Sequence, residues 1–109
     1  MDNMWAHYIQ EREGALVEQS SHGFAVYKVH GDIVYIQDIY VTPEYRQTGE
    51  ASRLADKVAE KAKIMGCSNM LGSVDISARG ATASLKVLLS YGMELDSLKP
   101  PLIYFKKVI

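Results

Sequence analysis

The sequence predicts an α/β fold of the mixed α+β kind, with helices packed on a mixed β-sheet, and three observations lead to it. Residues 33–41 are apolar on both faces apart from Gln37 and Asp38, which is typical of a central strand. Apolar residues then recur at helical spacing over 51–65, with charged residues opposite them. A second buried strand at 70–76 follows, so strands and helices alternate along the chain.

The remaining elements complete this order. A short helix is expected at 3–13, ended by Gly14, and a strand at 24–30 should form a hairpin with 33–41 through the Gly31-Asp32 turn. The polar stretch 18–23 is interpreted as a loop. The other predicted elements are a helix that turns Leu85, Leu88 and Leu89 inward and two closing strands separated by a break at Lys99-Pro100-Pro101: 81–91, 93–95 and 102–108.

Composition indicates one soluble domain, residues 1–109, that folds by itself in the cytoplasm. Of the 109 residues, 48% are hydrophobic and 23% charged, and a net charge of -1 gives no basic field to attract nucleic acid. Apolar runs such as 33–36 are far shorter than the roughly 20 residues that span a bilayer, and the chain's start is unlike a secretory signal. The single cysteine, Cys67, leaves no thiol pair for a disulfide or a zinc site, so no metal is expected.

The segment 46–51 links the predicted central strand to the start of the long helix, and this position favours an anion. The first N–H groups of a helix lack partners within it, and the helix dipole is positive there, so phosphate oxygens bind readily. Gly49 lets the backbone approach such a ligand closely, and Ala51 is small enough for close packing. Because the segment matches neither a Walker loop nor the G-x-G-x-x-G spacing, it indicates a pyrophosphate cradle of another type.

Residues 38–51, which read Asp-Ile-Tyr-Val-Thr-Pro-Glu-Tyr-Arg-Gln-Thr-Gly-Glu-Ala, resemble the signature of the GNAT superfamily of acyl-CoA N-acyltransferases. In that signature, R/Q-x-x-G-x-G/A follows a strand that ends in Val, as Arg46, Gly49 and Ala51 follow Val41 here. The likeness continues through the long helix, the next strand and the Tyr91-Gly92-Met93 ending of the second helix, and so covers about 23–109. The compact layout is also similar to small acetyltransferase-like proteins of bacteriophages.

This resemblance implies a GNAT-like fold, shortened at its N-terminus, that binds acetyl-CoA as co-substrate. The backbone at Ile39, Tyr40 and Val41 would line the path of the acetyl and pantetheine groups, and Arg46 would flank the phosphates. Backbone N–H groups in such a strand also suit the polarisation of a thioester carbonyl. The pyrophosphate would be bound by backbone amides of the loop and helix start, namely those of Gln47, Thr48, Gly49, Glu50, Ala51 and Ser52.

Acylation needs a neutral amine, and a lysine-like amine has a pKa near ~10.4, so a base or a desolvated pocket must assist. Asp38 is the leading candidate, because it interrupts an otherwise buried strand beside the expected acetyl position, although a structural role fits the sequence equally well. Gln37 stands where the family often has Glu. Weaker candidates are Asp75, on the second buried strand, and two histidines in or beside turns, His22 and His30.

The general acid that would reprotonate the departing thiolate is less clear. Leu88 replaces the Tyr that the family commonly places on the second helix. Tyr91 on an adjoining face of that helix and Tyr104 on a late strand are candidate substitutes, although packing roles are usual for such aromatics. A proton from solvent is a third option, because a thiol pKa of about 8.5 makes the thiolate a tolerable leaving group.

The N-terminal region is the second departure from the family, which usually has a strand and a helix pair before its first hairpin. Only residues 1–22 take that place here, in a region that helps to form the acceptor site. The groove is therefore expected to be open, completed by a second subunit, or shaped for part of a protein. Trp5 and Tyr8 would suit a homodimer contact or would pack on their own sheet.

Three functions follow as hypotheses. The first is an acetyl-CoA-dependent N-acetyltransferase that transfers the acetyl group directly to a primary amine of a small molecule or protein. The second is a GNAT-fold module that binds CoA or a partner protein without turnover. The third, a nucleic-acid-binding domain, lacks a basic face and an aromatic stacking motif, so neither nucleic acid nor a membrane is expected as a partner.

Overall fold

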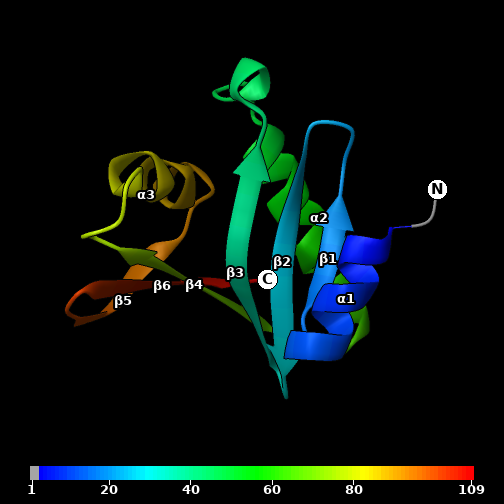
Figure 1. Ribbon diagram of the computed structural model, residues 1–109. Coiled ribbons are helices and arrows are strands. Elements are labelled where there is room, and N and C mark those ends of the chain that lie inside the picture. Colours follow the sequence, from blue (N-terminus) through cyan, green and yellow to red (C-terminus); the bar gives the residue numbers. More distant parts are fainter. Residues whose placement is uncertain (1–2) are drawn as a thin grey trace.

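The computed structural model describes residues 3–109, which form a six-stranded sheet with helices packed on it (Figure 1). Met1 and Asp2, at the start of the predicted domain, lie outside this range. Along the chain the elements are α1 Met4–Glu13, β1 Leu16–Gln19, β2 Gly23–His30, β3 Ile33–Val41, the 3-10 helix η1 Pro43–Tyr45, α2 Glu50–Ile64, β4 Asn69–Asp75, α3 Ala81–Ser90, β5 Glu94–Lys99 and β6 Leu102–Val108.

The strands lie in the order β1-β2-β3-β4-β6-β5. The neighbours β3 and β4 run parallel, and the other neighbouring pairs run antiparallel. This is the mixed sheet with flanking helices that the sequence predicts, and β3 has the interior place expected of it.

Strand β1 corrects the prediction of a loop at 18–23. Glu18 and Gln19 belong to β1, opposite Ala25 and Phe24 of β2. Glu18 is buried, and its carboxylate forms an ion pair with Lys61 of α2. A buried acid looks polar in the sequence, so the pattern there does not indicate a strand. The burial of Glu18 is explained only by its ion pair with Lys61, which lies on a helix far along the chain.

The C-terminal elements also differ from the prediction. Strand β5 reaches Lys99 instead of ending at residue 95, and pairing with β6 holds it although most of its side chains are exposed. On α3, Leu88 is buried and Leu85 packs against the core, whereas Leu89 is 54% exposed and does not point inward. An edge strand needs no apolar alternation when backbone hydrogen bonds hold it, which is why its sequence is uninformative.

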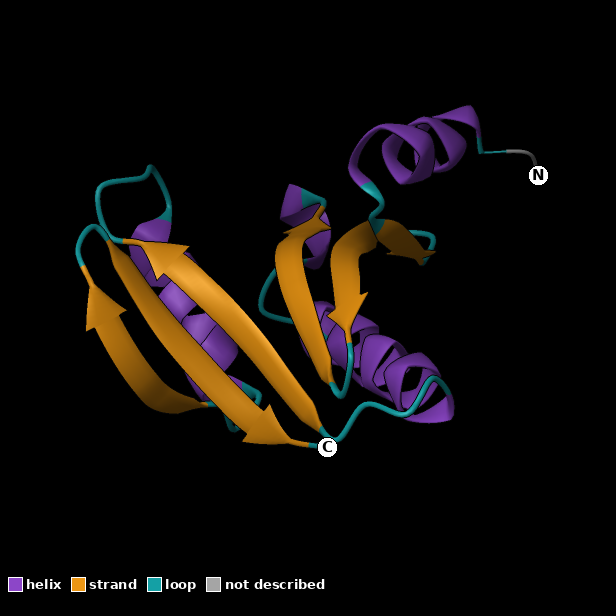
Figure 2. Ribbon diagram, turned by 90° about the horizontal axis from the view of Figure 1, so that it is seen from below, coloured by secondary structure: helices purple, strands orange, loops and turns teal. Residues whose placement is uncertain are grey.

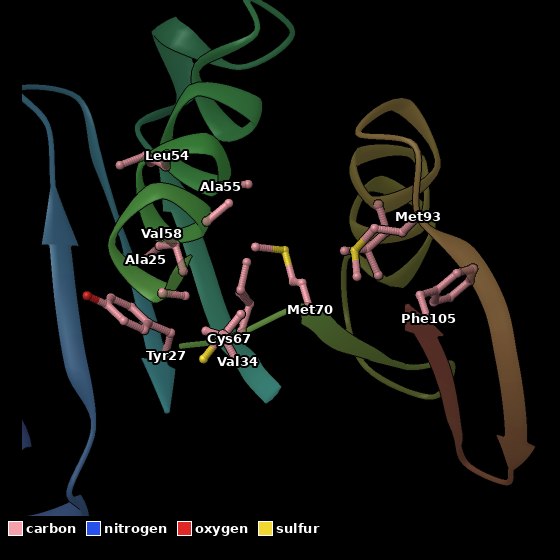
Figure 3. Packing of buried hydrophobic residues seen from close by; sticks show 14 of the residues in the cluster. Ala25, Tyr27, Val34, Leu54, Ala55, Val58, Cys67, Met70, Met93 and Phe105 are labelled. Atoms are coloured by element: carbon pink, nitrogen blue, oxygen red, sulfur yellow. The ribbon is translucent and has the colours of Figure 1, made fainter. Parts of the chain in front are cut away.

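The core lies between the sheet and the helices α2 and α3. Helix α2 turns Leu54, Ala55 and Val58 onto β2 and β3, while Met93 and Phe105 pack further along the sheet beneath α3 (Figure 3). Met70 of β4 is fully buried between these two groups (Figure 3). Cys67 is buried in the same cluster, in the apolar packing role that the sequence indicates.

The opposite face of the sheet is covered by α1 near its β1–β2 edge. Figure 2 shows α1 and α2 on opposite sides of the strands β2 and β3. Trp5 of α1 packs edge-on against Phe24, with ring centroids 4.7 Å apart. Trp5 therefore packs on its own sheet, and the homodimer contact stays a prediction. Among residues 3–109, no helix has the length and apolar character needed to cross a membrane.

Gly23 is the position where the fold most clearly excludes a side chain. A Cβ atom there would lie 2.3 Å from the carbonyl oxygen of Tyr40 and 3.1 Å from the Cα atom of Val41. We expect Gly23→Ala to lower the free energy of unfolding by about 2 kcal/mol, because β2 and β3 must move apart, and urea unfolding measures this.

Gly72→Ala is the matched control for Gly23→Ala. The nearest atom to its new Cβ would be Leu88 Cδ2 at 3.4 Å, the end of a flexible side chain. This variant should lose less than about 1 kcal/mol. Equal losses in the two variants would contradict the steric explanation.

Candidate functional site

The candidate site lies where the parallel strands β3 and β4 part. Their ladder joins Ile33–Ile36 to Asn69–Gly72 and goes no further, although β3 runs on to Val41 and β4 to Asp75 (Figure 1). Opposite Val26 and Tyr27 of β2, β3 carries one extra residue, Gln37. Such a bulge bends a strand, and here it falls where β3 leaves β4.

After Gln37, β3 has one backbone edge on the side of β4 that no longer pairs with β4. This edge contains the N–H groups of Ile39 and Val41. Thr42 donates its N–H to the carbonyl of His22, on the β2 side, at 2.8 Å. The carbonyl of Val41 instead accepts a hydrogen bond from Arg46 Nε at 2.9 Å. Because successive residues of a strand point their N–H groups to opposite sides, Val41 and Ile39 face away from β2, whereas Tyr40 faces it.

Helix α2 begins just beyond this strand end. Its N-cap residue, Gly49, has φ 86°, and its first backbone hydrogen bond runs from Arg53 N to Gly49 O. Among the hydrogen bonds found within residues 3–109, none is donated by the backbone N–H groups of the loop and first turn: Gln47, Thr48, Gly49, Glu50, Ala51 and Ser52. These amides lie at the positive end of the helix dipole, a setting that suits an anion, and the pyrophosphate contact predicted for them stays a prediction.

The loop that carries these amides is fixed by its own side chains. The Arg46 guanidinium is bonded to Val41 O and lies 5.6 Å from the centroid of the Tyr40 ring, so it folds back onto the end of β3. Thr48 Oγ1 donates to the carbonyl of Tyr45 at 2.5 Å, and Arg53 pairs with Glu50 at 3.0 Å. The contact of Arg46 with a phosphate therefore stays a prediction. The observed role of Arg46 is to join the end of β3 to the loop.

The turn between β1 and β2 supports the loop from outside, a contact that no local pattern predicts. The His22 ring stacks on Tyr45 with centroids 3.4 Å apart and planes 8° apart. Hydrogen bonds from Ser20 and then Arg53 lower the pKa of Glu50. His22, predicted as a weak catalytic candidate, thus lies against the loop that precedes α2.

A hollow of about 410 Å³ opens on the α1 side of the sheet, beside the bulge. Its walls come from α1, β2 and β3: Trp5, Ile9, Glu13, Phe24, Val26, Gln37, Asp38, Ile39 and Tyr40. Asp38 is exposed here, which corrects the expectation of a buried carboxylate within a doubly covered strand. Partial burial and, after it, the charge of Glu13 raise the pKa of Asp38. A carboxylate shifted in this direction is a better proton acceptor than an ordinary aspartate.

The two tyrosine candidates lie in different places. Tyr104 pairs with Ser73 across β6 and β4, on the face opposite buried Phe105, and Ser73 is hydrogen-bonded to Tyr35 at 2.6 Å. By strand alternation this is the open face that also bears Asp38. Tyr91 instead donates its hydroxyl to Asp56 of α2 at 2.9 Å, in a separate hollow of about 270 Å³.

The surroundings of Tyr91 suit a packing role. Lys107 Nζ lies 3.8 Å from the centroid of the Tyr91 ring and bonds to its carbonyl oxygen. Burial and, after it, the bond to Asp56 raise the pKa of the Tyr91 hydroxyl above its ordinary value. Its predicted role as an acid stays untested, and no residue lines both hollows.

The other weak candidates lie outside the first hollow. Asp75 Oδ1 accepts hydrogen bonds from Ser77 N at 2.9 Å and Ser77 Oγ at 2.6 Å, which lower the pKa of Asp75. His30 is exposed at the end of β2. Of the two acidic candidates, Asp38 is the one that lines the first hollow.

Comparison with known proteins gives one family match and several partial likenesses. Residues 4–88 match the model of the acetyltransferase (GNAT) family. The thialysine N-epsilon-acetyltransferase of Mus musculus is 41% identical over 59 residues, which make up 53% of this chain and 35% of that protein. The chain thus spans about a third of that relative. The predicted similarity to bacteriophage proteins finds no support in these matches.

Solved structures share the fold at low sequence identity. PaiA N-acetyltransferase from Thermoplasma acidophilum, in complex with coenzyme A, has a TM-score of 0.72 and 16% identity, covering 81% of this chain and 54% of that one. A GNAT family acetyltransferase from Elizabethkingia anophelis with acetyl-CoA bound has a TM-score of 0.68 and 15% identity, covering 85% and 74%. The predicted fold is confirmed.

The raised pKa of Asp38 makes a testable contribution to stability. A carboxyl whose pKa is higher in the folded state favours folding below its unfolded pKa and loses that contribution as the pH rises through the folded value. Asp38→Asn should therefore unfold at higher urea than the wild type at pH 7, by about 0.5 kcal/mol, with the difference gone below pH 3. If Asp38→Asn were less stable than the wild type at pH 7, the folded protein would instead stabilise the ionised carboxylate of Asp38.

Proposed function

Because the chain belongs to the GNAT family of acetyltransferases, we propose that it transfers an acetyl group from acetyl-CoA to a primary amine. One observation carries the proposal: the unpaired amides before α2, the free edge of β3 and the Asp38 carboxylate all adjoin the place where β3 parts from β4. An anion site, a row of N–H donors and a base are the three groups that transfer from a phosphate-bearing thioester requires.

In this proposal the pyrophosphate binds the amides from Gln47 to Ser52, and the thioester lies along the edge of β3. The N–H groups of Ile39 and Val41 are the donors available for the pantetheine amides and the thioester carbonyl. Tyr40 contributes its ring to the hollow and its backbone to β2. An N–H group aimed at the carbonyl oxygen stabilises the negative charge that develops when the amine attacks.

Asp38 would accept the proton that the amine nitrogen loses, directly or through one water. The neutral nitrogen bonds to the carbonyl carbon, the C–S bond then breaks, and the thiolate leaves. Partial burial favours this role, because it raises the pKa of Asp38 toward neutrality while leaving the carboxyl in contact with the hollow. No covalent enzyme intermediate is needed.

Tyr104 is our preferred source of the proton for the thiolate. Its face of the sheet bears Asp38, and Ser73 beside it is already hydrogen-bonded to another hydroxyl, that of Tyr35. Leu88, in the place where the family usually has its Tyr, is buried against Gly72. Solvent remains the competing donor, because a thiolate leaves without strong assistance.

The alternative is a module that binds CoA without turnover. Two observations favour it: Leu88 has no proton to give, and the Tyr91 hydroxyl is bound to Asp56. The name of the partial relative suggests that, if turnover occurs, a lysine-like side-chain amine is a suitable acceptor. Thiol release with a panel of amines separates the enzyme from the binding module.

Acetyl-CoA should stabilise the protein, and a bulky residue at Gly49 should abolish the effect. At a ligand concentration about 100 times Kd the gain is about 2.7 kcal/mol, which shifts the Tm of a chain this size by several degrees. Gly49→Trp places a ring among the amides of the α2 N-terminus and should remove the shift, as measured by thermal unfolding with and without acetyl-CoA.

Gly66→Trp is the control for Gly49→Trp. Gly66 has φ 96°, so a side chain strains its backbone as it does at Gly49, but it lies at the other end of α2. This variant should lose stability and keep the acetyl-CoA shift. Loss of the shift in both variants, or no shift in the wild type at millimolar acetyl-CoA, would refute the proposed binding site.

Asp38→Asn should lower kcat/KM for the amine by about 100-fold, a typical contribution of a general base. The thermal shift with acetyl-CoA should stay, because the amides before α2 are unchanged. Asp75→Asn, whose amide oxygen still accepts from Ser77, should keep its activity. If Asp75→Asn lost activity and Asp38→Asn kept it, Asp75 would be the base.

A further inference from the structure

We propose that the outer edge of β5 binds a second copy of this chain, so that two sheets pair edge to edge in a symmetric dimer. This inference goes beyond the proposed acetyltransferase function and does not depend on it. Strand β5 is the last strand of the sheet, at the end far from α1 (Figure 1). Within residues 3–109 it pairs with β6 alone, so the backbone groups on its outer edge have no strand partner.

The residues of β5 have a symmetric order along this edge. Asp96 lies where the register between β5 and β6 shifts, and it is the extra residue of a bulge. The strand's other residues lie opposite five successive residues of β6: Glu94, Leu95, Ser97, Leu98 and Lys99. Without Asp96, the order is therefore acid, leucine, serine, leucine, base. Reading it backwards exchanges the two charges and leaves everything else unchanged.

Antiparallel pairing with a second β5, centred on Ser97, makes use of this symmetry. Glu94 then lies opposite Lys99 of the second copy, and Leu95 lies opposite Leu98 of the second copy. A two-fold axis repeats both pairs on its other side, and Ser97 meets its own equivalent at the axis. Cross-strand pairs of opposite charge, of apolar side chains and of hydroxyl groups all stabilise antiparallel sheets.

The two faces of β5 are sorted as this pairing requires. Leu95 and Leu98 lie on the face where Phe105 is buried, and their side chains are 64% and 60% exposed. Glu94 and Lys99 are exposed on the opposite face, and neither takes part in an ion pair found within residues 3–109. A two-fold axis perpendicular to the sheet keeps equivalent faces together, so leucine meets leucine on one face and acid meets base on the other.

The order of charges favours a second copy over an unrelated segment. Any extended peptide can donate and accept backbone hydrogen bonds along a free strand edge. A second β5 adds the matching charges at both ends and the matching leucines between them, which also fixes the register. Six residues of strand span only about 20 Å, so the interface is small and the dimer should be weak.

Charge reversal tests the pairing directly. Sedimentation equilibrium of the full chain, up to millimolar protein, should show a monomer–dimer equilibrium. Glu94→Lys and Lys99→Glu should each raise the Kd of the dimer at least about tenfold, because each turns two attractive pairs into two repulsive ones. The double variant exchanges the charges and restores both pairs, so it should dimerise about as well as the wild type.

A mixture of the two single variants is the sharpest arm of the test. In a mixed dimer, the copy with two bases faces the copy with two acids, so opposite charges meet at both ends. The mixture should therefore dimerise although neither variant does so by itself at the same concentration. Lys57→Glu is the control, because it makes the same charge change as Lys99→Glu at an exposed position on α2. It should leave the Kd of the dimer unchanged.

Several results would overturn this inference. A wild-type chain that stays monomeric at millimolar concentration would do so, and so would a dimer that survives both single charge reversals. A mixture no more dimeric than its components, or an equal loss in Lys57→Glu, would have the same consequence. Far-ultraviolet circular dichroism shows whether each variant is folded. Because no measurement here involves acetyl-CoA, failure of the dimer leaves the proposed acetyltransferase function in place.

Discussion

The parallel strands β3 and β4 part before either of them ends, and the geometry of the candidate site follows from this. A parallel ladder normally continues as long as both strands do, because each unpaired N–H or C=O group costs free energy unless another partner satisfies it. Here β3 leaves β4 after Ile36 and Gly72, and the bulge at Gln37 supplies the bend. The sheet thereby has an interior strand with an open edge.

Several weak contacts keep that open edge in place. Gly23 lets β2 lie against the last residues of β3, Arg46 ties the loop to Val41, and His22 stacks on Tyr45. Two of these contacts involve the end of β3, and the third joins the β1–β2 turn to η1. Together they connect the loop before α2 to the end of β3 and to the β1–β2 turn, as a preorganised site requires.

The two sides of the site have opposite electrostatic character. The loop before α2 presents N–H groups and the positive end of a helix dipole, whereas the hollow beneath α1 presents Asp38 and Glu13. A phosphate-bearing donor and a cationic acceptor would therefore approach the parted strands from different sides. Partial burial and, after it, the charge of Glu13 raise the pKa of Asp38, so the ionised carboxylate is a cost in stability that a function in the hollow would explain.

Elements with local signals can be predicted from the amino-acid sequence alone. The apolar run of β3, the helical spacing of α2 and the glycines that flank α2 are local patterns, and so is the loop between strand and helix that predicts an anion site. Contacts between distant segments explain β1, whose buried Glu18 needs Lys61 from α2, and β5, which depends on pairing with β6. Tertiary structure also places Asp38 in an exposed hollow with Glu13 and binds Tyr91 to Asp56, because those environments come from residues far apart in the chain.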